Sequence, residues 1–286
     1  MQEKKDKNTF CENNIRIVAL DLDGTTFNSK GQVSDRTRNA LETAAKQGVH
    51  VVVSTGRSYN SLPEQIKSVK GIEYAITSNG AHINDIATGE SIYDSYLSER
   101  AVNAVAEMKD RIGCGLEVFV KGQAYMDTET FEEIRQFGSK YRNAEYILWS
   151  RKPTDDIISF MKDNKNIIEN INLCFNGPDH LEEHRSEVEA IPEATITSSF
   201  PNNLEVGGPN TSKKSALVEL LGRLSISPEN LMCCGDAPND IQMLEYAGIG
   251  VAMGNAWGGT KDHADYVTAT NDEDGVAQAF EKFVLK

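Results

Sequence analysis

The sequence predicts an α/β fold, in which a doubly wound parallel sheet forms a core and an α+β segment is inserted into it. Two observations support this prediction. Over residues 15–82, and again from residue 212, short apolar stretches that suit buried parallel strands alternate with helical periodicity. Between them, hairpin-like pairs are mixed with amphipathic helices. We therefore expect a core built from residues 1–82 and 207–286, and an inserted cap domain over residues 83–206.

The first elements follow a strand and helix rhythm. The stretch IRIVAL, which ends at Leu20, is typical of a strand buried on both faces. A helix follows it, with Ser34 as the candidate N-cap and Gly48 as the stop. The stretches VHVVVSTGR and EYAITSNG then predict two strands that end in polar residues and glycine. Because crossovers between parallel strands are right-handed, this order brings the loops after the strands to one edge of the sheet.

The later elements complete both parts of the fold. In the insertion, LEVFVKGQAYMD and TITSSFPNNLEV are typical of strand pairs. The α/β rhythm then resumes with a helix in SKKSALVELLGRL and a buried strand in ENLMCCGD. A helix in NDIQMLEYAG closes at Gly248, and IGVAM is a further strand. Residues 1–14 are polar throughout and are expected to form a frayed tail.

Composition narrows the class of protein. Acidic residues outnumber basic ones by 43 to 29, a net charge of −14, which argues against nucleic acid or an anionic membrane as partner. No signal-peptide core or membrane-length apolar run is found, and nothing indicates a protein partner. The five cysteines show no CxxC spacing, so neither a disulfide framework nor a zinc site is supported and a cytoplasmic location is expected. They stand at positions 11, 114, 174, 233 and 234.

Polar residues follow four predicted strands of the core. They are Asp21 with Asp23, Thr55 in STGR, Asn79 in SNG, and Asp236 in GDAPND, and the lysine pair Lys213 and Lys214 opens the helix before the last of these. Strand ends of one parallel sheet converge, so carboxylates, a hydroxyl and an ammonium would meet in one crevice. Two carboxylates crowded together need a hard cation such as Mg²⁺. This set of groups suits phosphoryl transfer.

Each group has a candidate role in such a transfer. Asp21 is the candidate nucleophile, since a carboxylate can accept a phosphoryl group. Asp23 is placed to protonate the leaving oxygen and later to deprotonate water. Asp21 and Asp236 would hold the metal, and Thr55 and Lys213 would hold the phosphate oxygens.

The segments DLDGT, STGR, SK before SAL, and GDAPNDIQML follow the order of the four motifs of the haloacid dehalogenase-like superfamily, and the chain resembles most closely its Cof-type sugar phosphatases. TSNGAHI, VAMGNA, ADYVT and NDEDGVAQAF resemble further landmarks of that family, so the resemblance extends over nearly all the chain from residue 15. It implies a Rossmann-like core, a mobile cap, and phosphate binding by the STGR motif, with Thr55 and Gly56.

The resemblance also assigns residues to the site. It implies that Asp21 is the nucleophile and Asp23 the general acid and base. It implies a Mg²⁺ ion bound by Asp21, the main-chain carbonyl of Asp23, and Asp236. Lys213 and Asn239 would lie at the phosphate, and Asp240 would support the metal and the lysine. Two positions depart from the family pattern: Thr26 stands where leucine is usual, and Lys214 where glycine is usual, which leaves open which lysine points inward.

Several residues also have a structural interpretation. Thr55, Asn239 and Asp240 could simply start helices. Arg57 could be a substrate contact or a surface residue, and it stays outside the predicted site. Cys233 and Cys234 fit inert packing in a buried strand. The segment HLEEH at residues 180–184 has the spacing of inverted zinc peptidases, but it falls in a charged helix of the insertion, which we expect to begin at Pro178.

The sequence therefore predicts Mg²⁺-dependent hydrolysis of a small phosphomonoester, most specifically a sugar phosphate or related phosphorylated metabolite. The cap would close over the substrate and exclude water. A phosphomutase and a non-catalytic sugar-phosphate sensor remain as alternatives. A sensor has no need of the acid Asp23 beside the nucleophile, which speaks against it.

Overall fold

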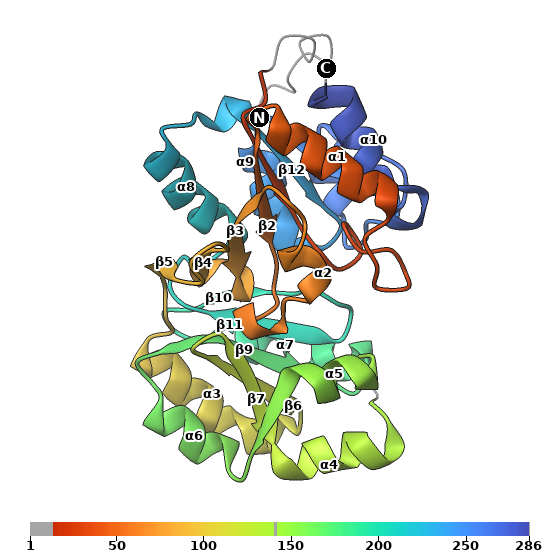
Figure 1. The fold of residues 1–286 in the computed structure, drawn as a ribbon. Coiled ribbons are helices and arrows are strands. Elements are labelled where there is room, and N and C mark those ends of the chain that lie inside the picture. Colours follow the sequence, from red (N-terminus) through yellow and green to blue (C-terminus); the bar gives the residue numbers. More distant parts are fainter. Residues whose placement is uncertain (1–13, 140–141, 286) are drawn as a thin grey trace.

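The structure, a computed structural model, describes residues 14–139 and 142–285. Two sheets lie one above the other, each with helices packed on it (Figure 1). Residues 1–13, which include Cys11 and nearly all of the predicted N-terminal tail, lie outside the described residues.

The first sheet contains eight strands in the order β14-β13-β12-β1-β2-β3-β4-β5. The strands from β14 to β3 run parallel, which confirms the predicted parallel sheet, and β4 and β5 add to it antiparallel at one edge. The bounds are β1 Ile17–Leu20, β2 His50–Ser54, β3 Ile72–Thr77, β4 His82–Asp85, β5 Ser91–Asp94, β12 Leu231–Gly235, β13 Ile249–Ala252 and β14 Tyr266–Val267.

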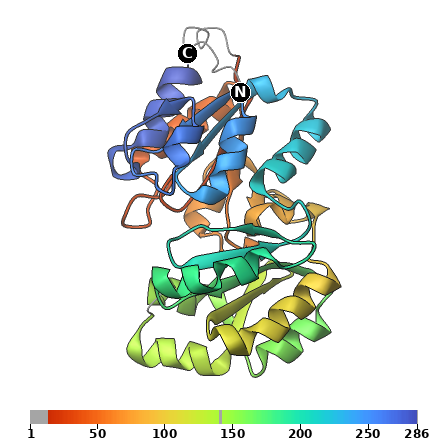
Figure 2. The ribbon, with the colours of Figure 1, turned by 180° about the vertical axis from the view of Figure 1, so that it is seen from behind.

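Helices cover both faces of this sheet. The cluster of buried side chains on one face includes residues of α1 and α10, and the cluster on the other face includes residues of α8 and α9. Figures 1 and 2 show α1 in front of the sheet in one view and the blue helix α9 in front in the opposite view. The helices of this part are α1 Asp35–Lys46, α2 Glu64–Lys67, α8 Lys213–Leu224, α9 Ile241–Tyr246 and α10 Gly275–Phe283. The fold is the doubly wound arrangement that the alternation of strands and helices predicts.

Local signals explain where the helices begin. The hydroxyl of Ser34 accepts the N–H of Thr37 at 3.0 Å and caps α1, as predicted. Ser212 caps α8 in the same way, and the side chain of Ser215 accepts the N–H of Ser212 in return at 2.8 Å. This capping box fixes the first turn of α8, which begins at Lys213.

The second sheet contains six strands in the order β10-β11-β9-β6-β7-β8. The two predicted hairpins are confirmed, since β6 pairs antiparallel with β7 and β10 with β11. Its strands are β6 Gly115–Val120, β7 Gln123–Asp127, β8 Arg151–Thr154, β9 Ile168–Cys174, β10 Thr195–Thr197 and β11 Asn203–Gly207. Its helices are α3 Glu99–Ile112, α4 Thr128–Phe137, α5 Ala144–Ser150, α6 Ile157–Asp163 and α7 Pro178–Glu189.

The two faces of the second sheet differ in polarity. On β11, Leu204 and Val206 pack into an apolar cluster with residues of α3, α6 and α7. The alternate residues Asn203 and Glu205 point to the opposite face, because side chains alternate along a strand. Glu205 contacts the side chain of Asn79, a residue of the first part. The polar face of the second sheet is therefore turned toward the first sheet.

The strands β4 and β5 lie within residues 83–206, the segment that we predict as the cap, except for His82. They nevertheless pair with β3 in the first sheet. The chain leaves that sheet after Asp94 and returns to it through α8. The division into a core and an inserted cap at residues 83 and 206 remains a prediction, and a boundary near residue 95 fits the strand pairing better.

Candidate active site

The predicted site residues follow the carboxyl ends of parallel strands. Asp21 comes directly after β1, Thr55 after β2, and Asp236 after β12, and all three are buried. Since β12, β1 and β2 are neighbours in the sheet, these residues emerge side by side at one edge. The polar face of the second sheet lies over this edge, because Glu205 of β11 reaches Asn79 there.

Lys213 joins two of the carboxylates. Its ammonium donates to Oδ1 of Asp21 and to Oδ1 of Asp240, both at 2.7 Å. Burial lowers the pKa of Lys213, but the charges of the two carboxylates outweigh burial and raise it, so the lysine stays protonated. Lys214 is exposed, and its ammonium lies 5.7 Å from the ring centre of Tyr246. The structure therefore places Lys213, and not Lys214, at Asp21.

Asp21, Asp236 and Asp240 lie together, with carboxylate oxygens within 4.8 Å of one another. Both carboxylate oxygens of Asp240 already accept hydrogen bonds. One accepts the ammonium of Lys213, and the other accepts the backbone N–H groups of Asp236 and Ala237 at 2.9 and 3.1 Å. Asp236 accepts the hydroxyl of Thr25 through Oδ1 at 2.9 Å. The remaining oxygens of Asp21 and Asp236 are therefore the ones left for a cation.

The surroundings of Asp236 fit a divalent ion. Gly24 has a φ of +81°, and a Cβ there would lie 2.4 Å from Oδ2 of Asp236, so the glycine leaves this oxygen room. Burial, together with Asp240, raises the pKa of Asp236 to about 7. Burial also raises the pKa of Asp21 well above its ordinary value, although Lys213 opposes this. Two crowded carboxylates that resist ionisation are what a hard cation such as Mg²⁺ would stabilise.

Thr26, which departs from the family pattern, has a structural function. Its hydroxyl donates to the main-chain carbonyl of Asp21 at 2.5 Å, and Thr26 is buried. This bond holds the turn that follows β1. A leucine would lack it.

Arg57 lies in the site, although the sequence does not predict it there. Its guanidinium donates to both oxygens of Asp23, through Nε at 2.7 Å and Nη2 at 2.6 Å. Partial loss of solvent raises the pKa of Asp23, whose side chain is 45% exposed, but the hydrogen bonds and charge of Arg57 outweigh this and lower the pKa below its ordinary value. The guanidinium also lies 4.4 Å from the ring centre of Tyr146 in α5. The only signal in the sequence was the position of Arg57 directly after Thr55 and Gly56.

The predicted phosphate-binding residues gather around Asn79. Thr55 accepts the N–H of Arg57 through its hydroxyl at 3.2 Å. A Cβ on Gly56 would lie 3.2 Å from Oδ1 of Asn79, so the loop approaches that side chain closely. Asn239 donates to the same Oδ1 at 3.0 Å. Thr55, Gly56 and Asn239 therefore surround one space beside Asp21.

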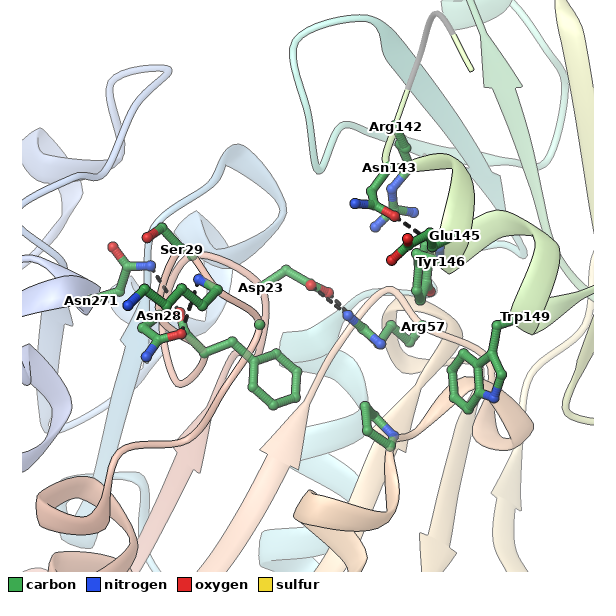
Figure 3. Close-up of a pocket in the computed structure, with 15 residues that line it drawn as sticks. Asp23, Asn28, Ser29, Arg57, Arg142, Asn143, Glu145, Tyr146, Trp149 and Asn271 are labelled. Atoms are coloured by element: carbon green, nitrogen blue, oxygen red, sulfur yellow. Dashed lines mark hydrogen bonds and ion pairs between the residues drawn. The ribbon is translucent and has the colours of Figure 1, made fainter. Parts of the chain in front are cut away.

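Two cavities meet at this point. The first, which we call the inner chamber, has a volume of about 130 Å³ and is lined by Asp21, Thr55, Gly56 and Asn239 from the first part, and by Glu205 among others from the second. The second, which we call the outer cleft, has a volume of about 880 Å³ and lies between residues 23–31 and α5. Figure 3 shows the outer cleft, with the pair of Asp23 and Arg57 near its centre.

The geometry supports neither a zinc site in HLEEH nor reactive thiols at Cys233 and Cys234. α7 begins at Pro178, as predicted, but both ring nitrogens of His180 are engaged: Nε2 lies 2.8 Å from the carbonyl of Ile112, and Nδ1 accepts the N–H of Asn176. Burial raises the pKa of Cys234 to about 12 and that of Cys233 well above its ordinary value, so both thiols stay protonated. Within the described residues, no helix has the length and apolar character to span a membrane.

Comparison with known proteins gives a consistent result. Residues 18–280 match the family described as haloacid dehalogenase-like hydrolase. The chain is 31% identical over 271 residues to the 5-amino-6-(5-phospho-D-ribitylamino)uracil phosphatase YcsE of Bacillus subtilis, covering 95% of this chain and 96% of that protein. It is 33% identical over 279 residues to the phosphatase YwpJ of the same organism, covering 92% and 98%. A solved sugar phosphatase of haloacid dehalogenase subclass IIB is 26% identical, with a TM-score of 0.78 over 94% of this chain and 98% of the other.

Proposed function

Because the chain belongs to the haloacid dehalogenase-like hydrolase family and is similar to two phosphatases of Bacillus subtilis, we propose that it is a Mg²⁺-dependent phosphatase of small phosphomonoesters, most specifically sugar phosphates, that works through an aspartyl phosphate. The observation that carries this proposal is the contact of Lys213 with Asp21 and Asp240 beside Asp236. Asp21 lines the same space as Thr55, Gly56 and Asn239.

The first half of the reaction transfers the phosphoryl group to the enzyme. Lys213 holds the carboxylate of Asp21, and a carboxylate oxygen of Asp21 forms a bond to phosphorus while the bond from phosphorus to the leaving oxygen breaks. Asp23 gives its proton to that leaving oxygen. Thr55 and Lys213 bind the other phosphate oxygens, and a Mg²⁺ ion held by Asp21, Asp236 and the carbonyl of Asp23 would neutralise their charge.

The second half returns the enzyme to its starting state. Asp23 takes a proton from a water molecule, and the water oxygen attacks phosphorus and releases Asp21 and inorganic phosphate. Arg57 keeps Asp23 ionised in this structure, which is the form that accepts a proton. Asp23 must leave Arg57 to act as the acid in the first half, so binding of the substrate has to rearrange this pair.

Asp240 acts through its neighbours and touches no substrate. Its two oxygens fix the ammonium of Lys213 and the turn that carries Asp236. It therefore positions a phosphate ligand and a metal ligand with one carboxylate.

The test is release of phosphate from p-nitrophenyl phosphate and from a panel of sugar phosphates, with Mg²⁺ and with a chelator. We expect Mg²⁺-dependent release that is lost in D21N. The matched control is D163N, an exposed aspartate at the end of α6, which should keep full activity.

Two results would contradict the proposal. An isomeric sugar phosphate formed with little free phosphate would identify a phosphomutase. Tight binding of sugar phosphates without turnover of any of them would identify a sensor.

A further inference from the structure

The general acid connects the two cavities. Asp23, Arg57 and Arg142 line both the inner chamber and the outer cleft, whereas Asp21 lines the inner chamber alone. In the proposed reaction, Asp21 contacts phosphorus and Asp23 contacts the leaving oxygen. The phosphoryl group therefore lies in the inner chamber, and the leaving group passes Asp23 toward the outer cleft.

The volumes of the two cavities also favour the phosphoryl group in the inner chamber and the leaving group in the outer cleft. Ligand sites usually measure about 300–1,000 Å³, so an inner chamber of about 130 Å³ has room for a phosphoryl group and little more. The outer cleft, at about 880 Å³, lies within the usual range. A substrate that fills both must be long, with its phosphate at one end.

The walls of the outer cleft favour a flat group at the other end. Trp149 of α5 is 60% exposed although it is a large aromatic side chain, and it lies outside the apolar cluster that holds α5 against α4. A single exposed tryptophan is unremarkable by itself. This one lines the cavity that continues the candidate active site, and its ring centre lies 6.4 Å from that of Tyr146.

Arg142 supplies a second flat surface. Its guanidinium lies 4.7 Å from the ring centre of Tyr146 and 5.1 Å from that of Phe200. Among the described residues it forms no ion pair with a carboxylate, unlike Arg57. An arginine of this kind can stack on a ring and donate hydrogen bonds to carbonyl oxygens.

In Figure 3, Trp149 and Arg142 extend from the second part of the molecule, and Asn28 and Asn271 lie on the opposite wall, with Asp23 and Arg57 between them. We propose that the outer cleft binds the far end of an elongated phosphomonoester, and that this end is a planar heterocycle with carbonyl acceptors held by Trp149 and Arg142. This inference rests on the proposed function and names the substrate class for the same site.

The test compares a substrate that carries a planar ring with one that lacks it. 5-Amino-6-(5-phospho-D-ribitylamino)uracil carries a pyrimidine ring, and D-ribitol 5-phosphate has a similar chain and phosphate without it. We expect kcat/KM to be at least tenfold higher for the ring-bearing compound, because stacking of a base on an aromatic side chain contributes an effect of about that size. W149A should lose most of this advantage, and W149F should keep most of it.

F137A is the matched control. Phe137 is also an exposed aromatic residue, 81% exposed at the end of α4, and it lines neither cavity. F137A should keep the full preference for the ring. Equal kcat/KM for the two compounds, or a preference that survives in W149A, would overturn the inference.

A binding measurement separates this inference from the proposed function. The sequence has two tryptophans, Trp149 and Trp257, and Trp257 lines neither cavity. The dephosphorylated compound 5-amino-6-(D-ribitylamino)uracil should quench the fluorescence of W257F, in which Trp149 remains, and not that of W149F. Quenching without any phosphatase activity would support binding of the ring in the outer cleft and refute the proposed phosphatase function. Turnover without quenching would support the phosphatase function and refute binding of the ring in the outer cleft.

Discussion

Replacing Asp236 with asparagine should stabilise the metal-free protein at neutral pH and abolish its response to Mg²⁺. The change removes a charge but keeps the shape of the side chain. The hydroxyl of Thr25 can still donate to Oδ1, as it does at 2.9 Å in the structure. The charge that is lost is one that the buried site tolerates poorly, because it lies beside Asp21 and Asp240.

The size of the effect follows from the pKa of Asp236. Burial raises this pKa from 3.8 to about 7, and each unit corresponds to about 1.4 kcal/mol. Ionised Asp236 therefore lowers the free energy of unfolding by at most about 4 kcal/mol at pH 7.5. The new amide group must find partners of its own, at a cost of about 1–3 kcal/mol, so we expect a net gain of about 1–3 kcal/mol in D236N.

The pKa of Asp236 also determines how the stability of the folded protein changes with pH. Between about pH 4 and pH 7 the folded protein holds a proton on Asp236 that the unfolded chain has lost. Stability from this group is therefore complete below about pH 4 and is lost as the pH rises through 7. The advantage of D236N over the wild type should be large at pH 7.5 and small at pH 5.

Urea unfolding in the presence of a chelator, at pH 5 and at pH 7.5, measures both predictions. Repeating it with Mg²⁺ should stabilise the wild type at pH 7.5 and leave D236N unchanged, because binding to the folded state alone raises its stability. D163N should behave as the wild type. If D236N were less stable than the wild type in chelator at pH 7.5, or were stabilised equally by Mg²⁺, the assignment of Asp236 as a strained metal ligand would be wrong.

Three further predictions concern other residues of the candidate active site. G24A should lose Mg²⁺-dependent activity because its Cβ would lie 2.4 Å from Asp236. G48A, with a similar φ of +84°, no atom within 4 Å and a position outside both cavities, should lose about 1 kcal/mol of stability and keep its activity; equal activity losses would contradict this. R57M should raise the pKa of Asp23, so kcat/KM should fall at a higher pH than in the wild type; an unchanged pH profile would show that Arg57 does not control the acid. K213M should lower the free energy of unfolding by about 3–5 kcal/mol in urea, since it leaves two buried carboxylates unpaired, and a loss below 1 kcal/mol would be inconsistent with that pairing.

Much of the fold follows from local features of the sequence. Apolar stretches such as IRIVAL and ENLMCC favour buried strands, and helix caps such as Ser34 act on residues three positions away. The order of strands and helices then determines that Asp21, Thr55 and Asp236 follow parallel strands. The family was recognisable for the same reason, because its motifs are short segments of consecutive residues.

Other features depend on which residues meet after the chain has folded. Neighbouring residues on a helix point about 100° apart, so the sequence could not decide between Lys213 and Lys214 until the packing of α8 against the sheet turned one inward. The pairing of Asp23 with Arg57 joins the ends of two strands, and the contact of Asn79 with Glu205 joins residues 126 positions apart. Local periodicity carries no information about such contacts.

The outer cleft is the clearest example of a feature that local sequence does not predict and that the tertiary structure creates. Its walls come from residues 23–31 and from α5, and Asn271 joins them from near the end of the chain. Each segment is unremarkable in the sequence, and Trp149 by itself is an exposed aromatic residue on a short helix. The sequence by itself determined the α/β fold, the family and the residues proposed for phosphoryl transfer, because strand ends and motifs are local. The tertiary structure decided the partner of Asp23 and the cleft proposed for the leaving group, because both are made by segments that only folding brings together.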